Sequence, residues 1–144
     1  MQRIKLSLPE KFAFTTSIRI RISDINYGGH VGNDAFLSLI HEARVQFYKH
    51  FGYSELNIGG VATIMADVAI EYKKELLQGN LVYIDVTAND FDKLGFDIYY
   101  HLYLLENDKP ITAGKAKTGI MCFDYATKKK VAIPAEVIEK LSNY

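Results

Sequence analysis

The sequence predicts an α+β fold in which an antiparallel sheet wraps around one long central helix. Three observations predict it. One segment repeats apolar residues at helical spacing over about five turns, four later segments alternate with a period of two, and turn-like stretches separate those four. The 144 residues suit one domain, 1–144, which is long enough to bury a core without disulfides or a metal.

The first strand is expected at Ser17–Ile22, because apolar and basic residues alternate there as in a strand with one buried face. The central helix follows, and its apolar stripe consists of Phe36, Ile40, Ala43, Phe47 and Phe51. Asn33 is expected to cap the first N–H groups of this helix, and Asp34 adds negative charge at its positive end. Gly52 is suited to end it.

Four further strands are expected, at Val61–Tyr72, Leu81–Thr87, Phe96–Leu105 and Ile111–Phe123. The turn-like segments LQGN, FDKLG and ENDKP separate them. A short helix from Pro134 to Leu141 closes the chain. The run IYYHLYLL in the third of these strands is apolar on both faces, so its outer face needs a cover, and a second copy of the chain is the simplest one. We therefore expect a homodimer or a homotetramer.

Composition excludes several classes of function. Lysine plus arginine equals aspartate plus glutamate at 17 each, so no net charge draws the chain to nucleic acid or a membrane surface. A lone cysteine, Cys122, cannot form an intramolecular disulfide and fits a reducing compartment, so the cytoplasm is expected. The first residues lack the apolar core of a signal peptide, and no stretch has the ~18 apolar residues of a membrane span. The four histidines show no metal-ligand spacing, so no metal is expected.

The loop DINYGGHVGND, residues 24 to 34, is the segment richest in chemically useful side chains. It holds five of them: Asp24, Asn26, His30, Asn33 and Asp34. Its glycines let a ligand approach the backbone, and the helix start offers unpaired N–H groups at a positive dipole end, which suits a developing oxyanion. A plain reading stays open, in which asparagine and glycine form a turn and His30 bonds a backbone carbonyl.

Loop and helix together resemble the hotdog-fold thioesterases of the 4-hydroxybenzoyl-CoA thioesterase and acyl-CoA thioester hydrolase type. Their motif Asp-x-Asp-x-x-Gly-x-Val, with a later Glu-Ala-Arg, is matched in register by Asp24, Asn26, Gly29, His30, Val31, Asn33 and Glu42-Ala43-Arg44. The segment Ala66–Leu81 is similar to the family's second strand and following turn. The resemblance covers most of the chain. It implies a hotdog fold of about five strands, an acyl group bound along the central helix, CoA at a subunit interface, and hydrolysis without a metal or other cofactor.

The resemblance implies catalytic roles for Asn26, His30 and Asp24. Asn26 stands where the family has its second aspartate, and an amide cannot take up a proton at neutral pH. Asn26 is therefore expected to hold the water or the thioester oxygen, while His30 assists proton transfer. Plant acyl-ACP thioesterases, whose loop this one partly resembles, have a histidine implicated in catalysis at the corresponding place. Asp24 is expected to anchor the loop through backbone N–H groups, or else to orient His30.

Five residues are expected to bind substrate: Gly28, Gly29, Val31, Asn33 and Glu42. By the resemblance, the N–H of Asn33 donates to the oxyanion, with Val31 nearby. Glu42 is the mid-helix carboxylate that can face a substrate, although a pair with Arg44 or a solvated position explains it equally. Lysines 73–74 and 128–130 can meet CoA phosphates or form ordinary wet surface.

We therefore expect a metal-independent acyl-CoA thioesterase that hydrolyses an acyl or aroyl thioester to the free acid and CoA. The alternative is a protein that binds acyl-CoA or acyl-carrier protein without hydrolysis, and Asn26 supports it. A dehydratase of the same fold ranks last, because such enzymes usually pair a histidine with a helix acid in a different motif.

Overall fold

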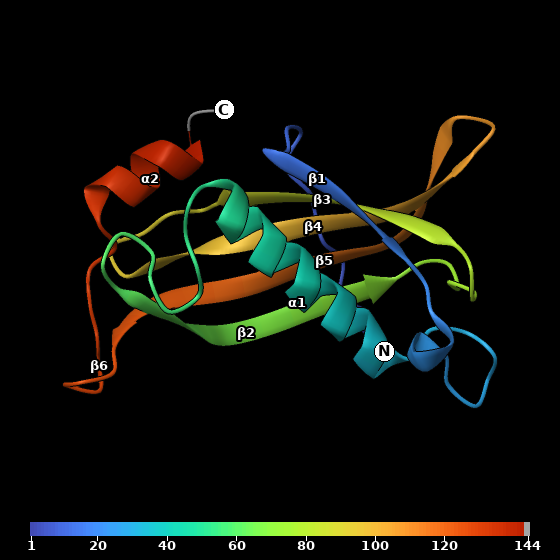
Figure 1. The fold of residues 1–144 in the computed structure, drawn as a ribbon, viewed down its shortest axis with the longest axis horizontal. Helices are drawn as coiled ribbons and strands as arrows, with labels where there is room; N and C mark the ends of the chain where they lie inside the picture. Colours follow the sequence, from blue (N-terminus) through green and yellow to red (C-terminus); the bar gives the residue numbers. More distant parts are fainter. Residues whose placement is uncertain (143–144) are drawn as a thin grey trace.

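The computed structural model describes residues 1–142. Its elements in chain order are β1 (Phe14–Arg19), the short 3-10 helix η1 (Ile22–Asp24), α1 (Asn33–His50), β2 (Ala62–Tyr72), β3 (Leu81–Asn89), β4 (Gly95–Glu106), β5 (Lys109–Asp124), β6 (Lys129–Lys130) and α2 (Ala135–Ser142). The strands pair antiparallel in the order β1-β3-β4-β5-β2, and β6 pairs with β5 (Figure 1). The predicted α+β class is confirmed.

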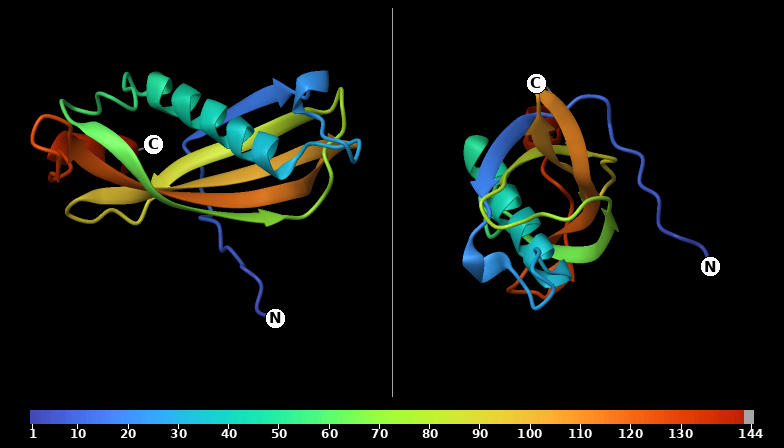
Figure 2. Two further views of the ribbon diagram at one scale, coloured as in Figure 1. Left: turned by 90° about the horizontal axis from the view of Figure 1, so that it is seen from below. Right: turned by 90° about the vertical axis from the view of Figure 1, so that its right-hand side faces the viewer.

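The sheet curls around α1, so that the core lies between the helix and the concave face of the sheet (Figure 2). Ile40, Ala43 and Phe47 of the predicted helical stripe are completely buried. On β4 the alternate residues Phe96 to Leu104 are buried as well. The apolar residues that recur at helical or strand spacing therefore lie on one face of each element, and these faces pack together into one core.

Most element ends differ from the sequence prediction by one to three residues, and two of the differences have a local cause. β1 ends at Arg19, and Ile22 is 68% exposed instead of continuing the buried face. The chain turns there because the carboxylate of Asp24 accepts the N–H of Arg21 at 2.8 Å and fixes η1. The N-cap of α1 is Gly32, with extended backbone and no side-chain cap, so Asn33 is the first helical residue and the predicted cap was wrong.

Residues 1–13 lie on the side of the sheet opposite α1, and the first of them extend away from the sheet (Figure 2). The N–H of Leu6 donates to Glu71 Oε1 of β2 at 2.9 Å, and the ring centroid of Phe12 lies 6.5 Å from that of His101 on β4. Tyr83 and Tyr103 stack on the same face with their centroids 5.7 Å apart. The N-terminal segment thus covers part of the outer face of the sheet. From the sequence, a second copy of the chain was expected to cover that face.

Gly114 of β5 makes room for the first large side chain of α1. A Cβ atom at position 114 would overlap the ring of Phe36 and lie 3.2 Å from the carbonyl oxygen of Glu71. The aromatic ring therefore sits directly on the strand backbone. This contact sets how closely the start of α1 approaches the sheet.

We predict that Gly114→Ala lowers the free energy of unfolding by about 1–3 kcal/mol, because the added methyl forces the Phe36 ring out of place. Urea unfolding measures this. The matched test is the double variant Gly114→Ala with Phe36→Leu, in which the shorter side chain leaves space for the methyl. We expect it to lose less than the sum of the single losses. Strictly additive losses would contradict the contact.

Candidate active site

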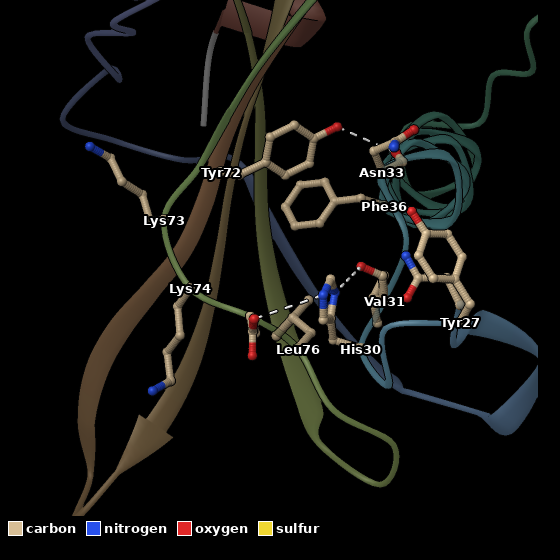
Figure 3. A pocket seen from close by; sticks show the side chains of 11 residues that line it. Tyr27, His30, Val31, Asn33, Phe36, Tyr72, Lys73, Lys74 and Leu76 are labelled. Carbon is tan, nitrogen blue, oxygen red and sulfur yellow. Dashed lines mark hydrogen bonds and ion pairs between the residues drawn. The ribbon is translucent and has the colours of Figure 1, made fainter.

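A groove opens between the start of α1, the loop before it and the segment after β2. It has a volume of about 470 Å³. Its lining residues are Asn26, Tyr27, His30, Val31, Asn33, Phe36, Tyr72, Lys73, Lys74, Glu75 and Leu76 (Figure 3). Four of the eight residues singled out from the sequence therefore meet in one cavity.

The loop is a tight hairpin-like turn. Ile25 and Val31 form a β-bridge, and the N–H of Asn26 donates to the carbonyl of His30 at 2.9 Å. Gly29 takes φ +82°, a conformation that favours glycine. The side-chain Oδ1 of Asn26 accepts the N–H of Gly28 at 2.8 Å. The plain reading of the asparagine as a turn residue is thus correct, and the same residue also lines the groove.

Backbone hydrogen bonds attach this loop to its surroundings. The N–H of Val31 donates to the carbonyl of Leu76 at 2.9 Å, and the N–H of Gly32 donates to that of Asp24 at 3.4 Å. Because its N–H already has an acceptor, Val31 contributes its side chain to the groove and has no free donor for an oxyanion. Asn33 opens α1, where the N–H groups of the first turn have no intrahelical acceptors.

His30 presents one ring nitrogen to the groove. Its Nδ1 lies 3.2 Å from the carbonyl oxygen of Val31, which accepts only from a protonated Nδ1. In the neutral ring this leaves a lone pair on Nε2. Nε2 lies 3.8 Å from Oε1 of Glu75, and the position of a Cβ on Gly28 would be 3.1 Å from it. The imidazole can therefore accept a proton at Nε2 from a molecule in the groove.

Phe36 and Tyr72 form an aromatic wall. Their ring centroids are 5.1 Å apart in an edge contact, and the Tyr72 hydroxyl donates to the carbonyl of Asn33 at 3.4 Å. Partial burial, and next the negative charge of Asp34, raise the pKa of Tyr72, so its hydroxyl stays protonated and remains a donor. Such a wall suits a flat or apolar group.

The two lysines of the groove already have acidic partners. Lys73 Nζ lies 2.5 Å from Glu71 Oε2, and Lys74 Nζ lies 3.8 Å from Glu106 Oε1. Figure 3 shows both side chains pointing away from the aromatic wall and from His30. They border the groove without adding charge to its interior.

The other singled-out residues lie elsewhere. Gly28 and Gly29 form the exposed tip of the loop. Asp24 is buried in η1, bonds the backbone N–H of Arg21 as an anchor, and lines a separate groove between β1 and α1. Glu42 lines that same groove and accepts the side-chain N–H of Gln46 at 2.9 Å. Neither carboxylate reaches the cavity of His30.

Arg44 pairs with Glu55 of the loop after α1, not with Glu42. Its Nε donates to Glu55 Oε1 at 2.8 Å, and its Nη1 donates to the hydroxyl of Tyr100 at 3.3 Å inside the core. Partial burial raises the pKa of Glu55, but the hydrogen bond and charge of Arg44 outweigh it and leave the pKa lowered. This pair gives the Glu-Ala-Arg motif a structural explanation for its arginine.

The groove is also lined by residues that the sequence did not single out as site residues, namely Tyr27, Phe36, Tyr72, Glu75 and Leu76. Within residues 1–142, no group of three histidine, cysteine or acidic side chains is arranged to hold a metal ion. None of the helices in that range is long and apolar enough to cross a membrane.

Comparisons with known proteins agree on one family. A family model described as the thioesterase-like superfamily matches residues 20–141. The 1,4-dihydroxy-2-naphthoyl-CoA hydrolase of Microcystis aeruginosa is 27% identical over 118 residues, which are 80% of this chain and 83% of that protein.

Two solved structures show the same fold. A 1,4-dihydroxy-2-naphthoyl-CoA thioesterase from Synechocystis has a TM-score of 0.79 and 20% identity, and the match covers 90% of this chain and 96% of that one. A DHNA-CoA thioesterase from Staphylococcus aureus has a TM-score of 0.77 and 18% identity, with 89% of each chain covered. The hotdog fold expected from the sequence is confirmed.

We predict that Gly28→Ala disturbs the ring of His30, because the new methyl would lie 3.1 Å from Nε2 and 3.2 Å from Asn26 Oδ1. The ring signals of His30 in two-dimensional NMR spectra should move while the melting temperature changes little. Gly60→Asn is the matched control, since Gly60 lies outside the groove, no atom beyond its chain neighbours lies within 4 Å of a Cβ there, and asparagine tolerates positive φ. Unchanged His30 signals in Gly28→Ala would contradict the packing.

Proposed function

The chain belongs to the thioesterase-like superfamily, and we propose that it hydrolyses an acyl or aroyl thioester of CoA to the free acid and CoA. One observation carries this proposal: Nε2 of His30, with Glu75 Oε1 at 3.8 Å, and the start of α1 border the same groove, beside an aromatic wall. A proton acceptor, backbone donors and an apolar surface are what thioester hydrolysis requires.

His30 is proposed as the general base. Water lies between Nε2 and the thioester carbonyl carbon, and Nε2 takes the proton as the water oxygen bonds to that carbon. The carbon–sulfur bond then breaks, and the proton passes from the ring to the leaving thiolate. The bond from Nδ1 to the Val31 carbonyl supports this role, because it fixes both the tautomer and the direction of the ring.

Asn26 and the start of α1 are proposed to hold the reacting groups. Asn26 Oδ1 is occupied by the Gly28 N–H, so its Nδ2 remains as a donor to the water or the thioester oxygen. The N–H of Asn33, at the positive end of α1, is the proposed donor to the oxyanion. These groups supply a base and donors from the chain itself, so the proposal requires no metal ion, and EDTA should leave turnover unchanged.

An aromatic acyl group is the favoured substrate within this class. The edge-packed rings of Phe36 and Tyr72 offer an aromatic surface at the helix start, against which an aromatic acyl group can pack. The relative from Microcystis aeruginosa is named for a naphthoyl-CoA substrate, which agrees with such a wall. Because Lys73 and Lys74 already pair with acids, we expect the CoA phosphates to replace those acids or to meet other cations. We further propose that the protein acts in the cytoplasm, where Cys122 stays reduced.

We predict that His30→Ala lowers the kcat for aroyl-CoA hydrolysis about 10²–10⁴-fold, because the water loses its base. Thiol release from aromatic and from short, medium and long aliphatic acyl-CoAs measures this. His50→Gln is the matched control, since His50 lies outside the groove and packs against Phe14 and Phe51. Full turnover in both His30→Ala and Asn26→Ala would contradict the mechanism.

Asn26 also supports a second candidate, a protein that binds acyl-CoA without hydrolysing it. The variant Asn26→Asp separates the two. If wild type releases no thiol while Asn26→Asp gains turnover, the chain is a binding protein on a thioesterase scaffold.

We also propose a homodimer formed through β2, which is one edge of the sheet. Residues 65–68 of this strand are exposed, and an exposed apolar edge attracts another strand. Ala66 is a bulge, and Thr63, Met65, Val68 and Ile70 all pair with buried residues of β5, so these four face inward. We propose that the two β2 strands pair antiparallel with Met65 opposite the partner's Val68. In this register, residues that face the core in one subunit lie opposite residues that face the core in the other.

We predict that multi-angle light scattering gives twice the chain mass for wild type. Val68→Lys should give a monomer, because it places charges inside the paired strands. Lys74→Gln, beyond the end of β2, is the control and should stay dimeric. A wild-type monomer would contradict the pairing.

A further inference from the structure

Residues 1–13 lie outside the part of the chain that the family model matches, yet one carboxylate connects them to the candidate site. Glu71 of β2 accepts the N–H of Leu6 on Oε1 at 2.9 Å, and its Oε2 lies 2.5 Å from Nζ of Lys73. Lys73 lines the groove of His30. A single acidic side chain thus joins the N-terminal segment to a cation at the border of the groove.

The Glu71 side chain has little contact with solvent, since only 13% of it is exposed. The hydrogen bond from Lys73, and next the one from the Leu6 N–H, lower the pKa of Glu71, so the side chain is ionised at neutral pH. Water can replace the donors of such a carboxylate only in part, and an ionised group without donors is unfavourable there. When one of its two donors leaves, the other therefore becomes more important.

Lys73 is the donor that can leave. Its backbone is fixed, because the N–H groups of Lys73 and Lys74 both donate to the carbonyl of Ala113, at 2.8 and 3.0 Å. Its side chain is 45% exposed, so the ammonium group can exchange Glu71 for an anionic ligand without any movement of the backbone. Under the proposed function, a phosphate group of CoA is such a ligand.

Resting on the proposed function, we propose that Glu71 is a positioning residue that couples the N-terminal segment to CoA binding. When a phosphate group takes Lys73, Glu71 keeps the hydrogen bond from Leu6, so the docked segment makes release of the lysine easier. Docking of residues 1–13 therefore strengthens CoA binding. By thermodynamic linkage, bound CoA strengthens the docking of the segment by the same factor. The effect falls on the affinity for CoA and leaves the chemistry at His30 unchanged.

Leu6→Pro tests this coupling, because proline has no N–H to donate. Calorimetric titration with CoA should give a Kd about fivefold higher than that of wild type, which is at the lower end of the usual coupling between two sites. In thiol release, KM should rise while kcat stays the same. Ser7→Pro is the matched control, since Ser7 is exposed and the bond to Glu71 comes from its neighbour. Its Kd should equal that of wild type.

A double-mutant cycle tests whether the effect passes through Glu71. Glu71→Gln keeps the shape of the side chain and removes its charge, so Lys73 is released and CoA should bind more tightly than to wild type. Adding Leu6→Pro to this variant should change the Kd less than about twofold, because no ion pair is left to exchange. An equal loss of affinity from Leu6→Pro in both backgrounds would overturn the role of Glu71.

Amide hydrogen exchange at Leu6 gives the reciprocal measurement. Saturating CoA should slow this exchange by the factor by which Leu6→Pro weakens CoA binding. Unchanged exchange at Leu6, or equal CoA affinity in wild type and Leu6→Pro, would overturn the inference while leaving the hydrolase function standing. A wild type that neither binds CoA nor releases thiol from any of the thioesters would instead contradict the proposed function, and with it the inference. The two failures are therefore distinguishable.

Discussion

The hydrogen bond from the Val31 N–H to the Leu76 carbonyl determines where the groove forms. It joins the loop before α1 to the segment after β2, and both residues are buried, so water does not compete for the bond. The ring of Phe36 resting on Gly114 sets the depth of the same region. His30 and Tyr72, which are distant in sequence, share a cavity because these two contacts hold their segments together.

Periodicity predicted the long elements well, because each buries one face and the burial repeats with the period of its backbone. The ends of β1 and α1 were harder to predict. They depend on the hydrogen bond from the Arg21 N–H to the Asp24 carboxylate and on the extended conformation of Gly32. The spacing of apolar residues carries no information about either. The loop residues stood out because they lie in one stretch. Nothing in the sequence marks Glu75 as a site residue, because it is distant from His30 in the chain and only the fold brings the two side chains together.

Several charges beside the groove and in the core are arranged in pairs, in keeping with a chain of zero net charge. Lys73 and Lys74 each have an acidic partner, and the buried Arg44 has Glu55. The electrostatics of the groove come from the Glu75 carboxylate and from dipoles at short range: an imidazole, an amide and the start of α1. Salt screens such contacts far less than it screens separated surface charges.

Residues 1–13 lie outside every strand of the described chain, although they cover part of the sheet. The Leu6 bond to Glu71 and the contact of Phe12 with His101 join them to it. A segment attached in this way opens locally at a much smaller free-energy cost than the strands beneath it. Each opening wets the aromatic surface of β3 and β4 while the core stays closed. Amide exchange and proteolysis in residues 1–13 therefore measure the opening of this segment alone. The sheet and α1 stay folded while it opens.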